Sequence, residues 1–341
     1  MSVPIDSLLL DRPFAIDGPE AFNALALDLF HLHAAHNPVY RGFLSGLGRR
    51  ATQIDHWTDI PCLPIGLFRS QNVAIGAAPG SSPIEGGRGM TFTSSGTTGA
   101  VTSKHHVPWP GLYERSFTEG FRRAFGEVNN WRILALLPSY LERSGSSLVY
   151  MAEHLIRESG DPMSGTYLNQ YGALHQVLVR SEEEGKRTML LGVPFALLDM
   201  AERHPMPLRN TVLVETGGMK GRRPEMVRDE LHGILQQAFQ LSGVHSEYGM
   251  TELLSQAWSN GRGLYQCPPW MQVRVRDVND PFAHPDIGRT GGIDVIDLCN
   301  IGSCPFISTQ DLGRMHDDGT FDVLGRFDNS DMRGCNLLVE D

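Results

Sequence analysis

Apolar residues recur at helical spacing near the start of the chain. Four of them lie three or four positions apart and would share one helix face: Phe22, Leu25, Leu29 and Leu32. Asn37-Pro38 follows, and because proline cannot continue a helix, the sequence predicts that this helix ends there. Residues 1–60 are expected to be mostly helical. Three histidines of this stretch would not share one face, which favours a solvated or half-buried helix surface over a metal site: His31, His33 and His36.

Continuous apolar runs follow in the middle of the chain. Residues 133–137 form one that Pro138 ends, and residues 188–194 and 210–215 form two more. Such runs are typical of strands buried on both faces, and a predicted helix at 195–204 joins the last two. This strand–helix–strand alternation predicts parallel strands in an α/β sheet.

Shorter patterns complete this middle region. Strands are predicted at 73–75 and 90–93, an extended stretch at 60–68, and helices at 111–125 and 148–158. We therefore expect an α/β nucleotide-binding core over residues 61–270.

The pattern changes at residue 271. Short β segments then alternate with Asp and Gly turns, at 272–278, 292–298, 306–308 and 321–324. A smaller β-rich lobe and tail is expected over residues 271–341, and all three regions are expected to form one compact unit.

Composition narrows the functional classes. The 341 residues are 41% hydrophobic and 20% charged, which is ordinary for a globular protein with a substantial core. The net charge of −10 argues against nucleic acid or an anionic membrane as the main partner, because both bind basic surfaces. No apolar run approaches a membrane span, and residues 1–10 lack the pattern of a signal peptide. Five cysteines without CxxC spacing fit a reducing compartment, so a cytoplasmic location is expected.

The most distinctive stretch is Thr93-Ser94-Ser95-Gly96-Thr97-Thr98-Gly99. Its glycines let backbone approach a ligand, and consecutive N–H groups in such a turn form a concavity suited to anions. We interpret it as a phosphate-binding loop. A flexible linker is the alternative, although a linker has no need of hydroxyls directly after a strand. Val101 rules out a Walker A motif, and neither GxGxxG after a strand nor GxSxG occurs.

Three more stretches follow this loop in a particular order. They are Glu215-Thr216-Gly217-Gly218, then Glu247-Tyr248-Gly249-Met250-Thr251-Glu252, then Ser308-Thr309-Gln310-Asp311-Leu312-Gly313 with Gly325-Arg326-Phe327-Asp328. Together the four stretches resemble the core motifs of the adenylate-forming superfamily, which includes acyl-CoA synthetases, peptide-synthetase adenylation domains and luciferases. The resemblance covers about residues 85–335. It implies the large N-terminal domain of that fold, with parallel and mixed sheets, flanking helices and a small β-rich lobe.

The resemblance also implies a role for each motif residue in adenylation. Thr93 to Gly99 would wrap the β- and γ-phosphates of ATP, and Gly217 and Gly218 would lie against the adenine. The stretch Glu247-Tyr248-Gly249-Met250 would bind the nucleotide, with Tyr248 stacked near the base. These roles fit the chemistry, because the attack of a carboxylate on the α-phosphate requires the charge of the pyrophosphate to be held.

The remaining motif residues would complete the site. By the same resemblance, Thr251 would bind the α-phosphate and Glu252 would hold Mg²⁺, a hard cation suited to carboxylate and phosphate oxygen. Asp311 would accept the ribose hydroxyls, and Arg326 would reach the ribose or phosphate. Singly, each has an ordinary alternative: Tyr248 in the core, Glu252 at a helix N-terminus, Asp311 in a turn and Arg326 in a surface ion pair.

Two features depart from the general superfamily pattern. Thr102 stands where a loop lysine is usual, so Lys220 is the predicted substitute cation near phosphate, with a solvated loop residue as the alternative. Superfamily members also usually continue into a mobile C-terminal lid that carries a catalytic lysine. This chain ends 15 residues after Arg326, so the lid is expected to be absent.

A closer resemblance is to the LuxE-type acyl-protein synthetases, which activate a fatty acid for a reductase complex. It rests on the segments 137–142, 145–151, 215–222 and 245–253. Members carry the acyl group as a thioester on a cysteine near the C-terminus, and the matching residue here is Cys335. A thiolate beside Arg333 would attack an acyl-adenylate readily. The alternative is a small apolar residue in a terminal strand, as expected of the other four cysteines: Cys62, Cys267, Cys299 and Cys304.

These inferences predict an ATP- and Mg²⁺-dependent ligase. It would convert a carboxylic acid, expected to be a fatty acid, to acyl-AMP and pass the acyl group to Cys335 for an acyl-reductase partner. Two alternatives stay open. One is a stand-alone adenylate ligase for an aromatic or other small acid, and the other is a nucleotide-binding partner subunit without turnover.

Overall fold

The computed structural model of the chain describes residues 5, 7–49, 51–75, 89–94, 102–138, 145–219, 222–224 and 226–327. Three helices lie near its start, α1 (Ser7–Asp11), α2 (Pro19–His36) and α3 (Pro38–Gly46), with 3₁₀ turns at Arg12–Ala15, Ala51–Gln53 and Trp57–Asp59. The predicted helix end at Asn37-Pro38 is confirmed. A second helix begins at once, because the Asn37 side chain accepts from Val39 N and Tyr40 N and proline suits a first helical position.

Most strands join in one sheet. Its order is β11-β12-β13-β14-β10-β9-β8-β7-β6-β4-β5, with β1 (Leu63–Pro64) paired to β13. The parallel strands are β4 (Arg132–Leu136), β5 (Gly165–Tyr167), β6 (Thr188–Gly192), β7 (Thr211–Glu215) and β8 (His245–Tyr248). The predicted apolar strands and their parallel pairing are confirmed.

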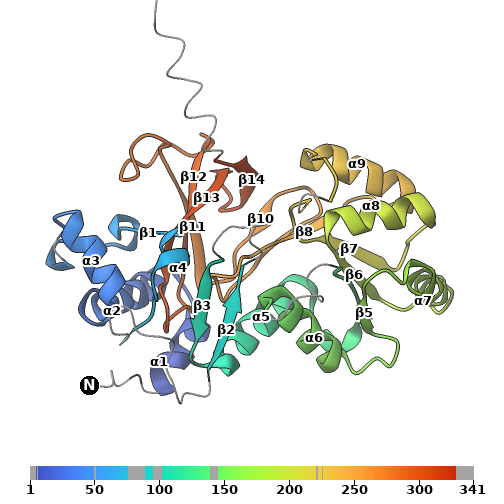
Figure 1. The fold of residues 1–341 in the computed structure, drawn as a ribbon, viewed down its shortest axis with the longest axis horizontal. Helices are drawn as coiled ribbons and strands as arrows, with labels where there is room; N and C mark the ends of the chain where they lie inside the picture. Colours follow the sequence, from blue (N-terminus) through green and yellow to red (C-terminus); the bar gives the residue numbers. More distant parts are fainter. Residues whose placement is uncertain are drawn as a thin grey trace, which may run out of the picture.

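Helices cover the parallel strands (Figure 1). In chain order they are α5 (Pro110–Phe125), α6 (Ser147–Ser159), α7 (Tyr171–Glu183), α8 (Pro194–Arg203) and α9 (Arg228–Phe239). Helices α8 and α9 lie on one face of β6 and β7, and α5 and α6 lie on the other. The predicted helices at 111–125, 148–158 and 195–204 are confirmed, and the strand–helix–strand order places the ends of β6, β7 and β8 at one sheet edge.

The antiparallel strands come from the second part of the chain. They are β9 (Ala257–Ser259), β10 (Tyr265–Gln266), β11 (Met271–Arg276), β12 (Gly291–Asp297), β13 (Phe306–Met315) and β14 (Phe321–Arg326). The four predicted β segments are confirmed, although β13 is longer than the predicted 306–308. Its pairing with β14 shifts register between Leu312 and Gly313, and because such a bulge interrupts the ladder only locally, the strand continues to Met315.

A two-stranded hairpin lies apart from this sheet. Strands β2 (Met90–Thr93) and β3 (Lys104–Val107) pair with each other only, and they lie between α4 (Leu67–Ser70) and α5 in Figure 1. The predicted strand at 90–93 is confirmed. The predicted strand at 73–75 is wrong, because Ile75 N donates to Gly302 O instead of joining a ladder, and residues 67–68 begin helix α4 rather than continuing an extended stretch.

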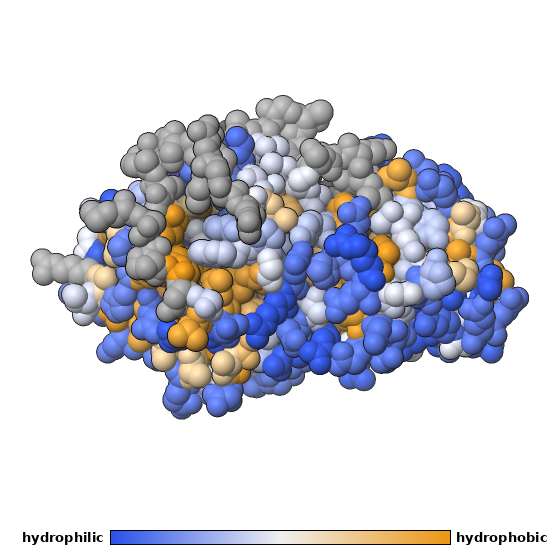
Figure 2. All heavy atoms as spheres, turned by 90° about the horizontal axis from the view of Figure 1, so that it is seen from below, coloured by the Kyte–Doolittle hydropathy of each residue, from blue (hydrophilic) through white to orange (hydrophobic). Residues whose placement is uncertain are grey.

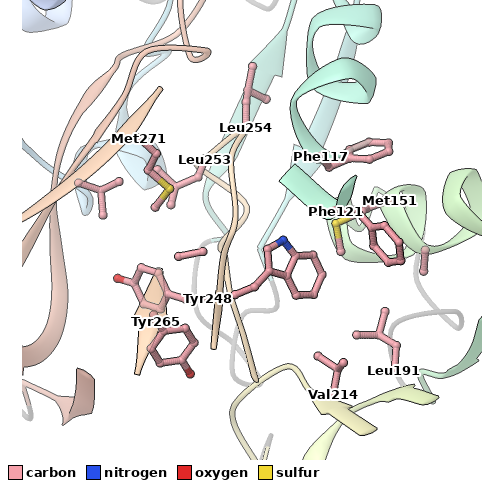
Figure 3. Packing of buried hydrophobic residues seen from close by; sticks show 14 of the residues in the cluster. Phe117, Phe121, Met151, Leu191, Val214, Tyr248, Leu253, Leu254, Tyr265 and Met271 are labelled. Atoms are coloured by element: carbon pink, nitrogen blue, oxygen red, sulfur yellow. The ribbon is translucent and has the colours of Figure 1, made fainter. Parts of the chain in front are cut away.

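Buried aromatic and aliphatic side chains fill the space around the sheet. Phe117 and Phe121 of α5 lie beside Met151 of α6, and Tyr248 lies beside Tyr265 (Figure 3). Seen from below, hydrophobic atoms gather on the half of the surface nearer the N-terminal helices, and the other half is mostly hydrophilic (Figure 2). None of the helices in the described ranges is long and apolar enough to cross a membrane.

Candidate active site

Hydrogen bonds join the two ends of the predicted phosphate-binding loop. We call these ends, Thr93-Ser94 and Ser103, the neck of the loop. Ser94 N donates to Ser103 O at 3.1 Å, and Ser103 N donates to Ser94 Oγ at 2.9 Å. Thr93 N donates to Gly145 O at 2.9 Å. Both ends of the loop are therefore fixed at the end of the β2–β3 hairpin. The predicted residues Ser95, Gly96, Thr97, Thr98 and Gly99 lie outside the described residues.

The β8–β9 loop (residues 249–256) brings Thr251 and Glu252 to this neck. Ser103 Oγ donates a short hydrogen bond to Glu252 Oε1, and the Glu252 carboxylate is buried. Burial raises the pKa of Glu252, while the hydrogen bond from Ser103 and the positive charges of Arg326 and Arg69 oppose that rise. Glu252 is not in a helix, so the alternative of a helix N-terminal carboxylate is wrong.

Asp311 lies at the centre of a second group of polar side chains. Tyr248 OH donates to Asp311 Oδ2 at 3.0 Å, and Arg326 Nε donates to Asp311 Oδ1 at 3.0 Å. Asp311 on β13 is the register partner of Arg326 on β14, so the alternative of a turn residue is wrong. The side chain of Arg326 is 74% exposed, so its contact with Asp311 agrees with the alternative interpretation of Arg326 as a surface ion-pair partner.

Tyr248 is buried, in agreement with its alternative interpretation as a core residue. Its ring contacts Tyr265 and Phe321 edge to face, with centroid separations of 5.8 and 5.4 Å. Burial and the neighbouring Asp311 carboxylate raise its pKa well above the usual range, so the hydroxyl stays protonated and donates. Stacking of Tyr248 on a base stays a prediction, and its observed contact is the one that fixes Asp311.

Gly217 and Gly218 follow β7 at the sheet edge. Their φ angles of 72° and 77° lie in the left-handed region, which strongly favours glycine. Gly217 N donates to Glu215 Oε2 at 2.6 Å, which holds the turn against the strand end. β7 and β8 pair through Glu215 and Ser246, so this turn lies beside the segment that carries Tyr248.

Glu215 is a buried carboxylate beneath this turn. Burial opposes its charge, but His232 and Arg228, each 3.6 Å from Oε1, and the Gly217 amide outweigh that effect and hold the pKa of Glu215 below its usual value of 4.5. Its ionised form therefore stabilises the fold fully above that value, and this contribution is lost as the pH falls through the lowered pKa.

A Glu215→Gln variant tests that contribution. We expect the free energy of unfolding of the wild type to fall more steeply on acidification below pH 4.5 than that of the variant. Urea unfolding of both proteins across this range measures the difference. Parallel curves would show that Glu215 carries no ionisation-linked stability.

The other predicted site residues divide into two groups. Glu247, Gly249 and Met250 flank the residues already described, with Glu247 buried at the end of β8 and Met250 packed against the core. Lys220 and Cys335 lie outside the described residues. The structure thus places Thr93 and Ser94 at the end of β2, Tyr248 at the end of β8 and Thr251 and Glu252 in the β8–β9 loop. Asp311 lies within β13 and Arg326 at the end of β14, and the roles of all these residues stay predictions.

The four described cysteines are buried or half-buried thiols. Burial raises the pKa of each, to about 12 for Cys304 and further for the rest: Cys62, Cys267 and Cys299. Because a thiolate is the nucleophilic form, none of them is suited to accept an acyl group. They act as small core residues, in agreement with the sequence interpretation.

The donor set around Glu252 fits Mg²⁺ held mainly by nucleotide. No group of three or more His, Cys, Asp or Glu side chains in the described ranges could hold a metal ion. A single buried carboxylate bonded to the neck of the predicted phosphate-binding loop matches the way Mg²⁺ is bound, through one or two carboxylates together with substrate phosphates.

The sequence did not identify several residues that hold the site together. Ser103 bonds Glu252, His105 and Asn300 bond the backbone of Thr251 and Glu252, and buried Asp297 accepts from Leu254 N and Ser255 N. The histidine pair His105-His106 is visible in the sequence, but no spacing rule connects it to a loop 146 residues away.

Comparison with known proteins finds structural likeness only. No protein-family model matches the chain, and no curated protein matches it in sequence. The solved structure of ATP-bound MatB from Rhodopseudomonas palustris matches with a TM-score of 0.53 and 17% identity, over 69% of this chain and 47% of that chain. This chain therefore spans less than half the length of MatB.

A 2-hydroxyisobutyryl-CoA ligase matches over more of the chain. Its open conformation in complex with 2-HIB-AMP and CoA gives a TM-score of 0.66 at 11% identity, over 91% of this chain and 70% of that chain. Its thioesterification state gives 0.67 at 13% identity, over 91% and 68%. At these identities the likeness shows the fold, and it confirms the predicted large α/β domain of adenylate-forming enzymes.

Proposed function

We propose that the protein is an AMP-forming ligase that uses ATP to activate a carboxylic acid. The observation that carries this proposal is the placement of Glu252 at the neck of the predicted phosphate-binding loop, together with the Asp311–Arg326 pair, whose arginine charge acts on the Glu252 carboxylate. The likeness of the fold to a CoA ligase that binds 2-HIB-AMP, an acyl-AMP, supports it.

Each group has a task in that reaction. Asp311, fixed by Tyr248, would accept the ribose hydroxyls, and the Thr251 hydroxyl would donate to the α-phosphate. The loop neck and Arg326 would hold phosphate charge as the acid's carboxylate oxygen attacks the α-phosphorus and pyrophosphate leaves. Glu252 would hold Mg²⁺, which when bound neutralises charge on the phosphate oxygens. Lys220 is our proposed substitute for the missing loop lysine.

For the second half-reaction we propose Cys335 as the acyl acceptor. Its thiolate sulfur would attack the carbonyl carbon of the acyl-adenylate, a C–S bond would form, the C–O bond to phosphate would break, and AMP would leave. The raised pKa of the other cysteines supports this choice, because none of them supplies a thiolate. The proposed acid is a fatty acid, and the proposed destination an acyl-reductase partner in the cytoplasm.

A stand-alone ligase for a small acid is the second candidate. It is favoured by the 2-hydroxyisobutyryl-CoA ligase, whose named acyl group is short. CoA, an amine or a carrier protein would then accept the acyl group.

Exchange of labelled pyrophosphate into ATP tests the proposal. We expect exchange that depends on an added carboxylic acid, and comparison of long-chain, aromatic and short hydroxy acids would identify the class. Absence of exchange over the whole panel would favour a nucleotide-binding subunit without turnover.

Peptide mass mapping tests the acceptor. After incubation with ATP, Mg²⁺ and the best acid of the panel, we expect an acyl adduct on the peptide that contains Cys335, and none in a Cys335→Ser variant. An adduct that survives the substitution would contradict the thioester assignment.

A further inference from the structure

We infer that His105 is a positioning residue, which sets the place of Thr251 and Glu252 from strand β3. Its Nδ1 donates to the carbonyl oxygen of Thr251 at 2.7 Å, and its Nε2 lies 3.0 Å from Asn300 Oδ1. The ring is fully buried. Its role in catalysis rests on the proposed function, while its role in holding the β8–β9 loop does not.

Asn300 extends this contact to the next residue of the loop. Its Nδ2 donates to Glu252 O at 2.8 Å and to Cys304 O at 2.9 Å. Because both partners are carbonyls, the amide nitrogen must face them, and the amide oxygen is on the side of His105 Nε2, which donates to it only when both ring nitrogens carry a proton. His105 and Asn300 together hold the carbonyls of both Thr251 and Glu252.

The strand that carries His105 begins directly after the loop neck. Ser103, two residues earlier, closes the neck through Ser94 and donates to the Glu252 side chain. Ser103 bonds the Glu252 side chain and His105 bonds the Thr251 carbonyl, so both residues face the β8–β9 loop. One short strand thus sets the distance between the phosphate-binding neck and the residues proposed for the α-phosphate and Mg²⁺.

The residues behind Asn300 are buried and hydrogen-bonded to one another. Asp297 accepts from Leu254 N, Ser255 N and Ser255 Oγ at 2.5–2.9 Å, which fixes the far half of the β8–β9 loop. Helix α2 and its C-cap residue Asn37 hold the turn after Asp297, since His33 Nε2 donates to Ile301 O at 3.1 Å and Asn37 Nδ2 donates to Ser303 O at 2.8 Å.

His33 differs from the sequence expectation. It was predicted on a solvated or half-buried helix face, yet its side chain is fully buried. Its Nδ1 lies 3.2 Å from Asn37 Nδ2, and its Nε2 bonds Ile301 O, so it has a buried polar partner on each side. The N-terminal helices therefore take part in supporting the site.

Three substitutions of His105 separate positioning from packing. His105→Asn places a side-chain amide close to the position of Nδ1, His105→Gln places one close to the position of Nε2, and His105→Phe keeps only ring volume. Because Nδ1 bonds the Thr251 carbonyl, we expect His105→Asn to resemble the wild type most. The matched control is His106→Phe, since His106 points to the other side of the strand and contacts Thr91 Oγ1.

Hydrogen–deuterium exchange measures positioning without any turnover. In His105→Phe and His105→Gln we expect faster exchange in the peptide that covers residues 249–256, and in His106→Phe no change there. Unchanged exchange in all His105 variants would overturn the inference. So would a uniform rise over the whole sheet, because His105 would then support only the core.

Pyrophosphate-exchange kinetics tests whether the position of the β8–β9 loop matters for catalysis. The variants His105→Phe and His105→Gln should need more Mg²⁺ for half-maximal pyrophosphate exchange. Their kcat/KM for ATP should fall roughly 10- to 100-fold, as is usual when a residue that supports a metal ligand is removed. A wild type that shows no exchange activity would reject the proposed function and leave the loop result standing. Active variants with wild-type Mg²⁺ dependence would reject the role of His105 in catalysis.

Discussion

Pyrophosphate exchange is expected to fall by roughly 10²- to 10³-fold in a Glu252→Gln variant. The substitution removes the charge that would hold Mg²⁺ but keeps the size of the side chain and an oxygen that can accept from Ser103. Steady-state exchange at several Mg²⁺ concentrations measures the loss, and excess Mg²⁺ should restore only part of the activity.

The same variant should be no less stable than the wild type. Burial raises the pKa of Glu252, so the fold bears a cost for keeping this carboxylate charged, and a neutral amide removes that cost. Thermal unfolding checks this. A matched control is Glu127→Gln, since Glu127 is an exposed carboxylate paired with Arg122 and should leave exchange unchanged. Wild-type exchange in Glu252→Gln would contradict the role of Glu252.

A large rise in KM for ATP is expected in an Asp311→Asn variant. A hydrogen bond to a charged group contributes about 1.5–3 kcal/mol, so removal of the charge should raise KM for ATP roughly 10- to 100-fold if Asp311 accepts the ribose hydroxyls. The value of kcat should change less, because ribose contacts are made before and during the reaction alike.

Two other variants show whether Asp311 itself binds the ribose or whether a change elsewhere in this region has the same effect. Asp322→Asn removes a carboxylate from the neighbouring strand β14, where it pairs with Arg314, and should leave KM for ATP unchanged. Tyr248→Phe removes the donor to Asp311 Oδ2 and should raise KM less than Asp311→Asn does. An unchanged KM in Asp311→Asn would show that the nucleotide binds elsewhere.

The fold was largely predictable from local sequence patterns. The apolar runs at 188–194 and 210–215 predict buried strands because a strand covered on both faces has no polar side, and β6 and β7 have that burial. Residues 73–75 show the limit of this reasoning. They are apolar like a strand, but tertiary bonds to the turn at 302–303 take their backbone groups instead of a ladder.

The residues that hold the motif residues in place could not be predicted from local sequence patterns. His105 meets Asn300 across 195 residues of sequence and Thr251 across 146, and no periodicity links such positions. Asp311 shows a related limit. It belongs to a strand that continues through a register shift, and the polar residues near that shift resemble a turn in the sequence. The motif residues were found because their order resembles a known superfamily, whereas the residues that hold them have no such order.

One measurement tests the central claim most directly. The acid accepted in the exchange assay is labelled with ¹⁸O in both carboxylate oxygens, and the AMP released after acyl transfer is examined by mass spectrometry. If the carboxylate attacks the α-phosphorus, one labelled oxygen stays with the phosphate when the acyl group departs, so AMP should carry one ¹⁸O. Unlabelled AMP, or formation of ADP in its place, would contradict the proposal that this protein adenylates a carboxylic acid.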